Sequence, residues 1–166
     1  MKLYHGGIVE IKTPRIMATD HIGDFGSGFY TTTDLEQARR FVATKCDRAR
    51  KTQGVVSHFE TADDFLAAPG LRTLVFETAD EKWARFVEAN RRDVGYRHEY
   101  DIIYGPVADD QVYASFALYE SGLIDFSELL NRLKFRKLTD QVLFHTERAL
   151  AVLKYTGCEV VRCPRK

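Results

Sequence analysis

The stretch DFGSGFYTTTDLEQA, Asp24–Ala38, joins a glycine-rich segment to an extended segment and then to a helix. Aromatic and β-branched residues over 28–33 are typical of a strand. Asp34 with Gln37 three residues later has the form of a capping box, which begins a helix. Gly26 and Gly28 lack a Cβ atom, so the backbone there can lie against a flat ligand or turn tightly. Both interpretations of the glycines remain open from the sequence.

The helix after Asp34 is predicted to bury one apolar face. Apolar residues recur there at helical spacing and would pack on a sheet. These residues are Leu35, Ala38, Phe41, Val42, Cys46 and Ala49.

The remaining chain alternates between strand and helix patterns without a regular βαβ rhythm. Strands are expected at 2–7, 55–60, 100–106, 141–146 and 158–163, and 71–77 is ambiguous between strand and extended loop. Helices are expected from a second capping box at Thr78 and Glu81, over 110–120, over 127–134 and after 146. We therefore predict a single domain, 1–166, of the α+β class with a mixed or antiparallel sheet.

Composition restricts the function. Lys and Arg number 24, as do Asp and Glu, so the net charge is zero and a long nucleic-acid footprint is not indicated. A short contact through the basic cluster Arg48, Arg50 and Lys51 stays open. Three cysteines and five histidines show no metal-site spacing, so no metal is expected. Neither a signal peptide nor a bilayer-spanning run is evident, which favours the cytoplasm and no membrane partner.

His5 and Gly6 end the first predicted strand, in KLYHGG. This places an imidazole beside a backbone amide that no side chain shields. Such a pair suits a ligand that carries both a hydroxyl and an amide, although a histidine near a turn is often structural.

LYHG, followed about twenty residues later by FGSGFYTT and a helix, resembles the ADP-ribosyltransferase fold in its poly(ADP-ribose) polymerase-like and diphtheria-toxin-like branch. DQVLFHTERALAVLKY is similar to the last catalytic strand of that superfamily. With YDIIYGPVADD, these motifs make nearly the whole chain resemble a bacterial family known as domain of unknown function 3990. The resemblance implies a split sheet with flanking helices and NAD as substrate.

The resemblance also implies roles for individual residues. His5 would bind the ribose on the adenine side, the Gly6 backbone would hold the nicotinamide carboxamide, and Tyr30 would wall the nicotinamide ring. His5 and Tyr30 would then face one cleft. The expected NAD-binding residues are His5, Gly6, Gly28, Phe29 and Tyr30, and the expected catalytic residues are Gln141, Tyr30, His5 and Asp109.

Gln141 stands where the superfamily has a glutamate. Cleavage of the nicotinamide–ribose bond creates positive charge that a carboxylate stabilises, and a glutamine supplies no charge. A glutamate at this position would restore the anion. Asp109 is an alternative acid, although it also suits a helix cap, and Asp140 would have to enter the site from the opposite face of its strand.

The resemblance implies transfer of one ADP-ribose from NAD to a macromolecular acceptor that the sequence does not name, and pairing with a small antitoxin protein. A non-catalytic module that binds NAD or ADP-ribose is the first alternative. A partner-binding protein with a vestigial cleft is the second.

Overall fold

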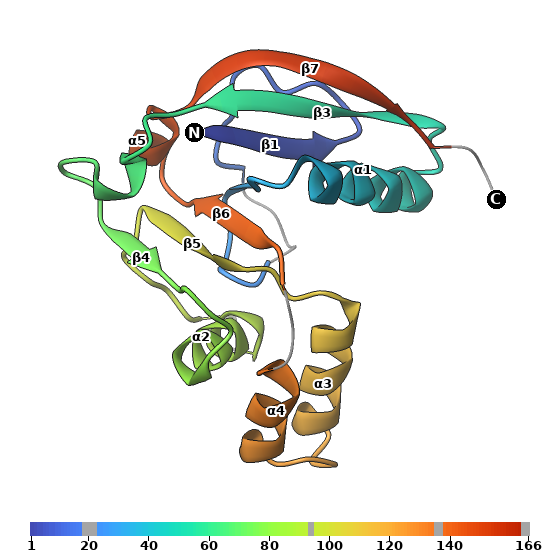
Figure 1. Ribbon diagram of the computed structural model, residues 1–166, viewed down its shortest axis with the longest axis vertical. Coiled ribbons are helices and arrows are strands. Elements are labelled where there is room, and N and C mark those ends of the chain that lie inside the picture. Colours follow the sequence, from blue (N-terminus) through green and yellow to red (C-terminus); the bar gives the residue numbers. More distant parts are fainter. Residues whose placement is uncertain (18–22, 93–94, 135–137, 164–166) are drawn as a thin grey trace.

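Two open sheets form the body of the molecule in the computed structural model, which describes residues 1–17, 23–92, 95–134 and 138–163 (Figure 1). The first sheet has the order β1-β3-β7, and both pairs are antiparallel. The second has the order β2-β6-β5-β4 and is antiparallel except between β4 and β5. The strands are β1 (Lys2–Gly7), β2 (Phe29–Thr31), β3 (Gln53–Glu60), β4 (Thr73–Val75), β5 (Ile102–Pro106), β6 (Asp140–Phe144) and β7 (Lys154–Arg162).

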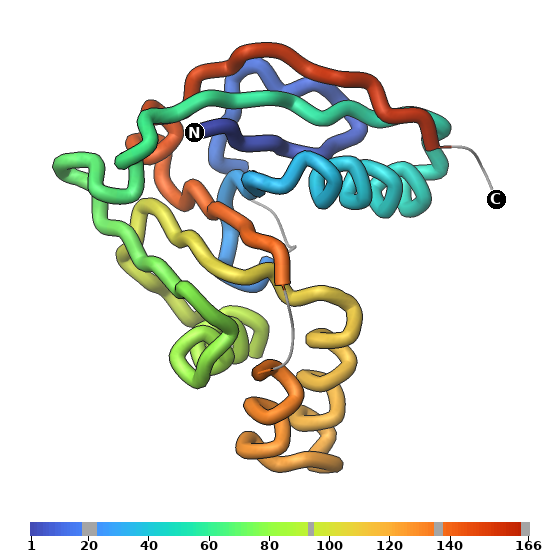
Figure 2. The backbone as a smooth tube through the Cα atoms, viewed as in Figure 1, coloured from blue at the N-terminus to red at the C-terminus, as the bar shows by residue number. Residues whose placement is uncertain are grey.

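The two sheets are joined where β1 meets the end of β2. The Tyr4 amide donates to the Thr32 carbonyl at 2.9 Å, and the Thr32 amide donates to the Tyr4 carbonyl at 3.0 Å. The backbone trace shows the first sheet above the second, with α1 beside the junction (Figure 2). The α+β class with a mixed or antiparallel sheet is confirmed, and β4 resolves the ambiguity over 71–77 in favour of a strand.

Helix α1 (Leu35–Ala49) begins as predicted, because the Asp34 carboxylate accepts a hydrogen bond from the Gln37 amide at 3.1 Å. Ala38, Val42 and Cys46 are buried against the first sheet. The prediction was wrong for Ala49, which is exposed, and for Phe41, whose side chain is 45% exposed. Phe41 lies about 100° around the helix from Val42, on a flank rather than on the buried face.

Helix α2 (Glu81–Arg92) also departs from the prediction. Its N-terminal cap is Asp80, whose carboxylate accepts a hydrogen bond from the Trp83 amide at 2.9 Å. The predicted capping box of Thr78 and Glu81 is therefore not the cap. The remaining helices are α3 (Asp110–Glu120), α4 (Phe126–Leu133), α5 (Glu147–Leu150) and a 3-10 turn, η1 (Phe65–Ala67). Helices α3 and α4 form a hairpin that extends away from the sheets (Figure 1).

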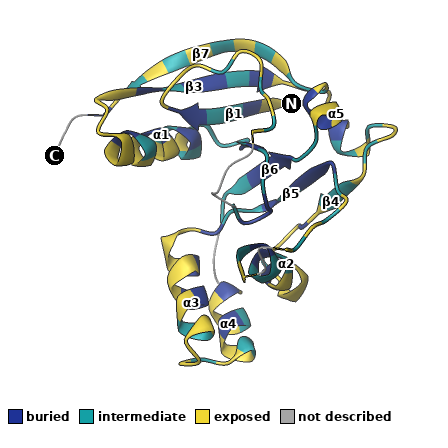
Figure 3. Cartoon of the chain, turned by 180° about the vertical axis from the view of Figure 1, so that it is seen from behind, coloured by how far each residue is buried: buried dark blue, intermediate teal, exposed yellow. Residues whose placement is uncertain are grey.

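Two large apolar clusters hold the layers together. One lies between the second sheet and helices α2, α3 and α4 and includes Trp83, Ile103, Phe116 and Leu143. The other lies between the two sheets and includes Phe29 and Phe144. Figure 3 shows buried residues on the strands and on the inward sides of the helices.

Candidate functional site

A cavity of about 420 Å³ opens beside the end of β1. Its wall combines the last residues of β1, the segment that follows them and the last turns of α1. The lining residues are His5, Gly7, Ile8, Val9, Ile11, Lys45, Arg48 and Ala49. We call this the basic cavity, because its charged side chains are those of Lys45 and Arg48.

His5 is fixed in one tautomer. Its Nδ1 lies 2.7 Å from the Tyr30 carbonyl oxygen, which can only accept, so Nδ1–H is the donor. The ring stacks on Phe29 with centroids 4.4 Å apart. Burial lowers the pKa of His5 to about 4, so the imidazole is neutral near pH 7. The remaining nitrogen, Nε2, is then an acceptor, and a ribose hydroxyl would have to donate to it.

Lys45 and Arg48 make the basic cavity attractive to an anion. Lys45 is half-buried, and burial, followed by the charge of Arg48, lowers the pKa of its ammonium group. Two neighbouring cations, one of them partly desolvated, are stabilised by a bound negative charge. The Lys45 Nζ also lies 4.8 Å from the centroid of the exposed Phe41 ring.

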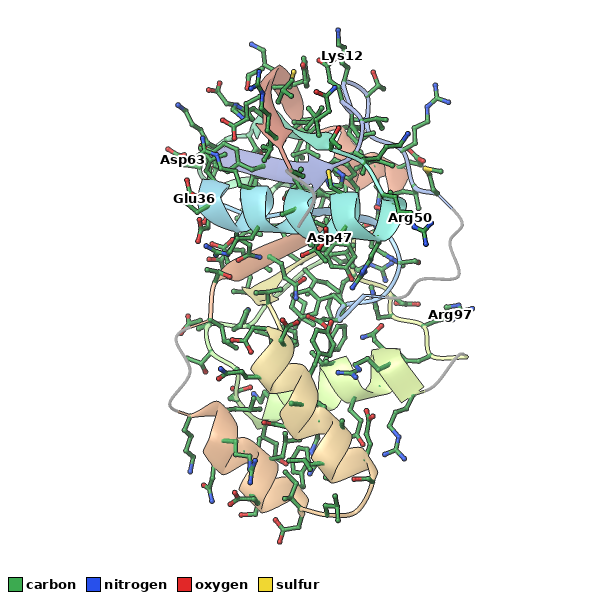
Figure 4. All side chains as sticks on the ribbon, turned by 90° about the vertical axis from the view of Figure 1, so that its right-hand side faces the viewer. Lys12, Glu36, Asp47, Arg50, Asp63 and Arg97 are labelled. Atoms are coloured by element: carbon green, nitrogen blue, oxygen red, sulfur yellow. The ribbon has the colours of Figure 1, made fainter. Side chains whose placement is uncertain are left out.

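One flank of α1 connects the basic cavity with the other end of the helix. Asp34, Gln37, Phe41, Lys45 and Arg48 are three or four positions apart, so they lie on one side. We call this row the α1 flank. Figure 4 shows α1 running across the molecule, with Glu36 near one end and Asp47 and Arg50 near the other.

A second cavity, of about 320 Å³, lies where α1 begins. It is lined by Asp34, Phe76, Glu77, Tyr104, Gly105, Pro106, Leu138, Thr139 and Asp140, and we call it the acidic cavity. The Gln37 side-chain amide donates to the Asp140 carbonyl at 3.2 Å, which places this end of the α1 flank against β6. The flank therefore runs from an acidic cavity, past an exposed aromatic ring, to a basic cavity.

Asp140 holds its carboxylate at the junction of β2 and α1. The carboxylate accepts from the Thr33 amide at 2.8 Å, from the Thr32 hydroxyl at 3.0 Å and from the Thr33 hydroxyl. Successive strand residues point to opposite sides of a sheet. Asp140 therefore shares the side of Val142 and Phe144, which pack between the two sheets together with Phe29, the residue on which His5 stacks.

Gln141 points the other way, into the interior. It is 6% exposed, and its Nε2 donates to Asp24 at 3.0 Å and to the Pro106 carbonyl at 3.2 Å. Asp24 is 3% exposed and also accepts from the Ala108 amide at 3.0 Å and the Tyr113 hydroxyl at 2.7 Å. Gln141, a predicted catalytic residue, therefore lines neither described cavity, and its amide is committed to a buried carboxylate.

Tyr30 lies on the same side of the second sheet as Gln141. Its hydroxyl donates to the Gly26 carbonyl at 2.6 Å and accepts from the Phe25 amide at 3.1 Å, and burial raises its pKa. Its neighbour Phe29 points to the opposite side, toward His5. The structure therefore does not bring the Tyr30 and His5 side chains into one cleft, and neither described cavity includes Tyr30.

Packing within the chain accounts for the glycines. A Cβ atom at Gly23 would lie 2.5 Å from the Tyr30 hydroxyl oxygen, and one at Gly28 would lie 2.5 Å from the Phe144 carbonyl oxygen. Gly26 and Gly28 also have φ values of +100° and +149°, which side chains disfavour. The atoms that approach this backbone belong to Tyr30 and β6. Gly6 likewise packs against the Ala38 carbonyl of α1.

Asp109 is a helix cap. Its carboxylate accepts from the Gln111 amide at 3.1 Å and the Val112 amide at 2.8 Å at the start of α3, and the residue is exposed. It lines neither described cavity. Of the alternatives left by the sequence, the structure favours the cap.

Sequence reasoning missed Phe41 and Lys45 as candidate binding residues. The helical spacing predicts a buried Phe41, and Lys45 belongs to no sequence motif that would mark it as a binding residue. The basic cluster that includes Arg48 was the only signal pointing to this end of α1.

Comparison with known proteins gives a family without an assigned activity. A family model described as "Protein of unknown function (DUF3990)" matches residues 1–155. The chain belongs to this family. The matched region includes both cavities and the whole α1 flank. No curated protein and no solved structure matches the chain.

Two further observations concern the described residues alone. No helix among them is long and apolar enough to cross a membrane. Within the same ranges, no three His, Cys, Asp or Glu side chains converge as they would around a metal ion.

Proposed function

We propose that this chain binds NAD along the α1 flank. The observation that carries the proposal is the arrangement of charge: the two cations and neutral His5 at one end, exposed Phe41 in the middle and Asp140 at the other. The diphosphate of NAD is anionic, whereas its nicotinamide ring is flat and cationic. A dinucleotide placed with its diphosphate at Lys45 and Arg48 and its nicotinamide near Phe41 and Asp140 matches this order.

The length of the flank supports the same placement. Phe41 and Arg48 are seven positions apart, or about 10 Å along a helix axis. This is the scale of the half of a dinucleotide that runs from the nicotinamide ring to the diphosphate, and the adenine half would then lie at the basic cavity. Aromatic faces stack on flat heterocycles, and a cation gains further from the electron-rich face of a ring. Neutral His5 presents Nε2 as an acceptor for a ribose hydroxyl in the basic cavity.

Transfer of ADP-ribose from NAD is the second candidate function, and the position of Asp140 favours it. In such a transfer the bond between ribose C1′ and the nicotinamide nitrogen breaks, nicotinamide leaves as a neutral molecule, and an acceptor nucleophile attacks C1′. The Asp140 carboxylate would stabilise the positive charge that develops on the ribose. We therefore assign to Asp140 the role that the sequence alone assigned to Gln141. The split of the strands into two sheets and the resemblance of LYHG and FGSGFYTT to ADP-ribosyltransferases support this candidate, with an unnamed acceptor and an antitoxin partner as further proposals.

Calorimetric titration with NAD tests the binding proposal. Lys45→Ala and Arg48→Ala should each weaken NAD binding about 10-fold or more, because each removes a charge-assisted contact worth roughly 1.5–3 kcal/mol. Lys51→Ala is the matched control, since Lys51 is exposed and lines neither cavity. Wild-type affinity in both cavity variants would rule out this placement of the diphosphate.

Labelled NAD then separates binding from transfer. Asp140→Asn keeps the shape of the side chain and should lower nicotinamide release by about 10²–10³-fold, the usual cost of one preorganised electrostatic group. Its NAD affinity should fall much less than this, because the charge-assisted contacts of Lys45 and Arg48 with the diphosphate are kept. If the wild-type protein binds NAD but releases no nicotinamide, the non-catalytic module is the correct function.

A further inference from the structure

Two buried cysteines from distant parts of the chain come together under α1. Cys46 lies in the last turn of α1 and Cys163 follows the end of β7; their exposed fractions are 0% and 9%. Both belong to one small apolar cluster that also contains Val42 and Val56. The Cys163 thiol donates to the Val161 carbonyl oxygen at 3.8 Å, and Cys163 contributes to the raised pKa of the neighbouring Cys46 thiol.

The surrounding backbone holds both residues in place. The Cys163 amide donates to the Thr52 carbonyl at 2.8 Å, which continues the β3–β7 ladder by one residue. On the α1 side, Gly54 has no side chain, and a Cβ atom there would lie 3.1 Å from the Cys46 sulfur. The strand pairing thus directs Cys163 toward α1, and the glycine leaves space for the Cys46 sulfur.

We propose that Cys46 and Cys163 are an oxidative modification site, at which a peroxide or a small-molecule disulfide converts the thiol pair into a disulfide. With hydrogen peroxide, the Cys163 thiolate attacks one oxygen, giving a sulfenic acid and hydroxide. The Cys46 thiol then displaces the hydroxyl group, so that an S–S bond forms and water leaves. With oxidised glutathione, two exchange steps give the same bond and two molecules of reduced glutathione.

Cys163 is the first residue to react, because it is the more exposed of the two. Burial raises the pKa of the Cys46 thiol to about 11, so little thiolate is present there at neutral pH. Cys46 therefore acts as the resolving thiol, and formation of the bond is slow compared with that of an exposed thiol pair.

The disulfide would join the last turns of α1 to the end of β7. It would link positions 46 and 163 and so close a loop of more than a hundred residues, which strongly restricts the unfolded chain. The same turns carry Lys45 and Arg48, so the cross-link would fix one wall of the basic cavity. The inference rests on the thiol pair alone and does not depend on NAD binding.

The third cysteine provides a matched control. Cys158 is exposed and pairs across the sheet with Ser57, on the side of the sheet that faces away from α1. Its neighbour Glu159, on the α1 side, bonds the Arg39 guanidinium of α1 at 2.6 and 2.8 Å. The Cys158 side chain therefore lies on the opposite face of the sheet from Cys46 and Cys163 and cannot join the pair.

The test uses the full chain, incubated with hydrogen peroxide or, separately, with oxidised glutathione. We expect a peptide linking Cys46 to Cys163 in mass spectra, and in Cys158→Ser, which lacks the exposed thiol, the free-thiol count should fall from two to zero. The melting temperature should rise by about 5–15 °C, and dithiothreitol should reverse both changes. Cys158→Ser should behave like wild type, whereas Cys163→Ser should abolish the cross-link and the shift.

Cys163 is at the end of a strand, so its serine variant is expected to fold, and its circular dichroism checks this. Three outcomes would each overturn the proposal: a Cys163 that gains oxygen atoms without cross-linking, a cross-link that contains Cys158, or a cross-linked protein with an unchanged melting temperature.

Discussion

Replacement of Gln141 by glutamate tests how the interior polar cluster is built. In the wild-type protein the Gln141 amide donates to Asp24 at 3.0 Å, and both side chains are almost fully buried. Gln141→Glu would place two carboxylates about 3 Å apart. At an effective dielectric constant of 20, two such charges repel by about 5 kcal/mol. The pair avoids this repulsion by keeping one proton.

The cost of that proton sets the expected magnitude. Keeping a proton on a carboxyl group whose unfolded-state pKa is near 4.3 costs about 3.7 kcal/mol at pH 7. The same proton costs only about 1 kcal/mol at pH 5. The folded-state pKa of the pair is raised, so stability is present at low pH and is lost as pH rises. Gln141→Glu should therefore lower the free energy of unfolding by about 3–4 kcal/mol at pH 7 and by about 1 kcal/mol at pH 5.

Urea denaturation at both pH values measures this difference. Gln141→Met is the matched control, because it removes the amide without adding charge and should cost about 1–3 kcal/mol at either pH. A Gln141→Glu variant as stable as wild type at pH 7, with faster NAD cleavage, would refute this reasoning. It would return Gln141 to the catalytic position that the sequence suggested.

Arg148→Ala should lower the free energy of unfolding by about 1–3 kcal/mol in urea, because it removes the ion-pair partner of the buried Asp101 carboxylate, which keeps the Arg72 amide and the Thr146 hydroxyl as donors. The Arg148 guanidinium holds the pKa of Asp101 well below its usual range, so this stabilisation is present above about pH 4 and is lost as pH falls; the variant should lose less stability than wild type between pH 5 and pH 3. His5→Gln should reduce the loss of stability between pH 6.5 and pH 4, measured in the same way, because burial lowers the pKa of His5 to about 4 and the unfolded chain binds the proton first. Asp109→Ala should cost about 0.5–2 kcal/mol as a lost cap and leave NAD affinity unchanged; a loss of NAD affinity without a loss of stability would assign Asp109 to the site.

The features that the sequence determined are those set by neighbours along the chain. Asp34 caps α1 because the amide it binds belongs to Gln37, three residues away, and this geometry needs no tertiary contact. The α+β class and most strands followed from alternation and turn residues for the same reason. The prediction of a capping box at Thr78 was wrong for an equally local reason, because the Asp80 carboxylate, two residues later, caps the helix in place of the Thr78 hydroxyl.

Only the tertiary structure decided which side chains meet. The sequence could not show that the Gln141 amide would donate to Asp24. Nor could it show that Asp140, rather than Gln141, would lie on the side of β6 that faces the space between the two sheets. Lys45 joins His5 at the basic cavity, and Cys46 meets Cys163, through contacts between segments far apart in the chain. Residue order fixes hydrogen bonds within a turn or a helix, but the pairing of distant strands, such as β3 with β7 and β5 with β6, determines which side chains far apart in the chain become neighbours. That pairing depends on burial summed over the whole molecule.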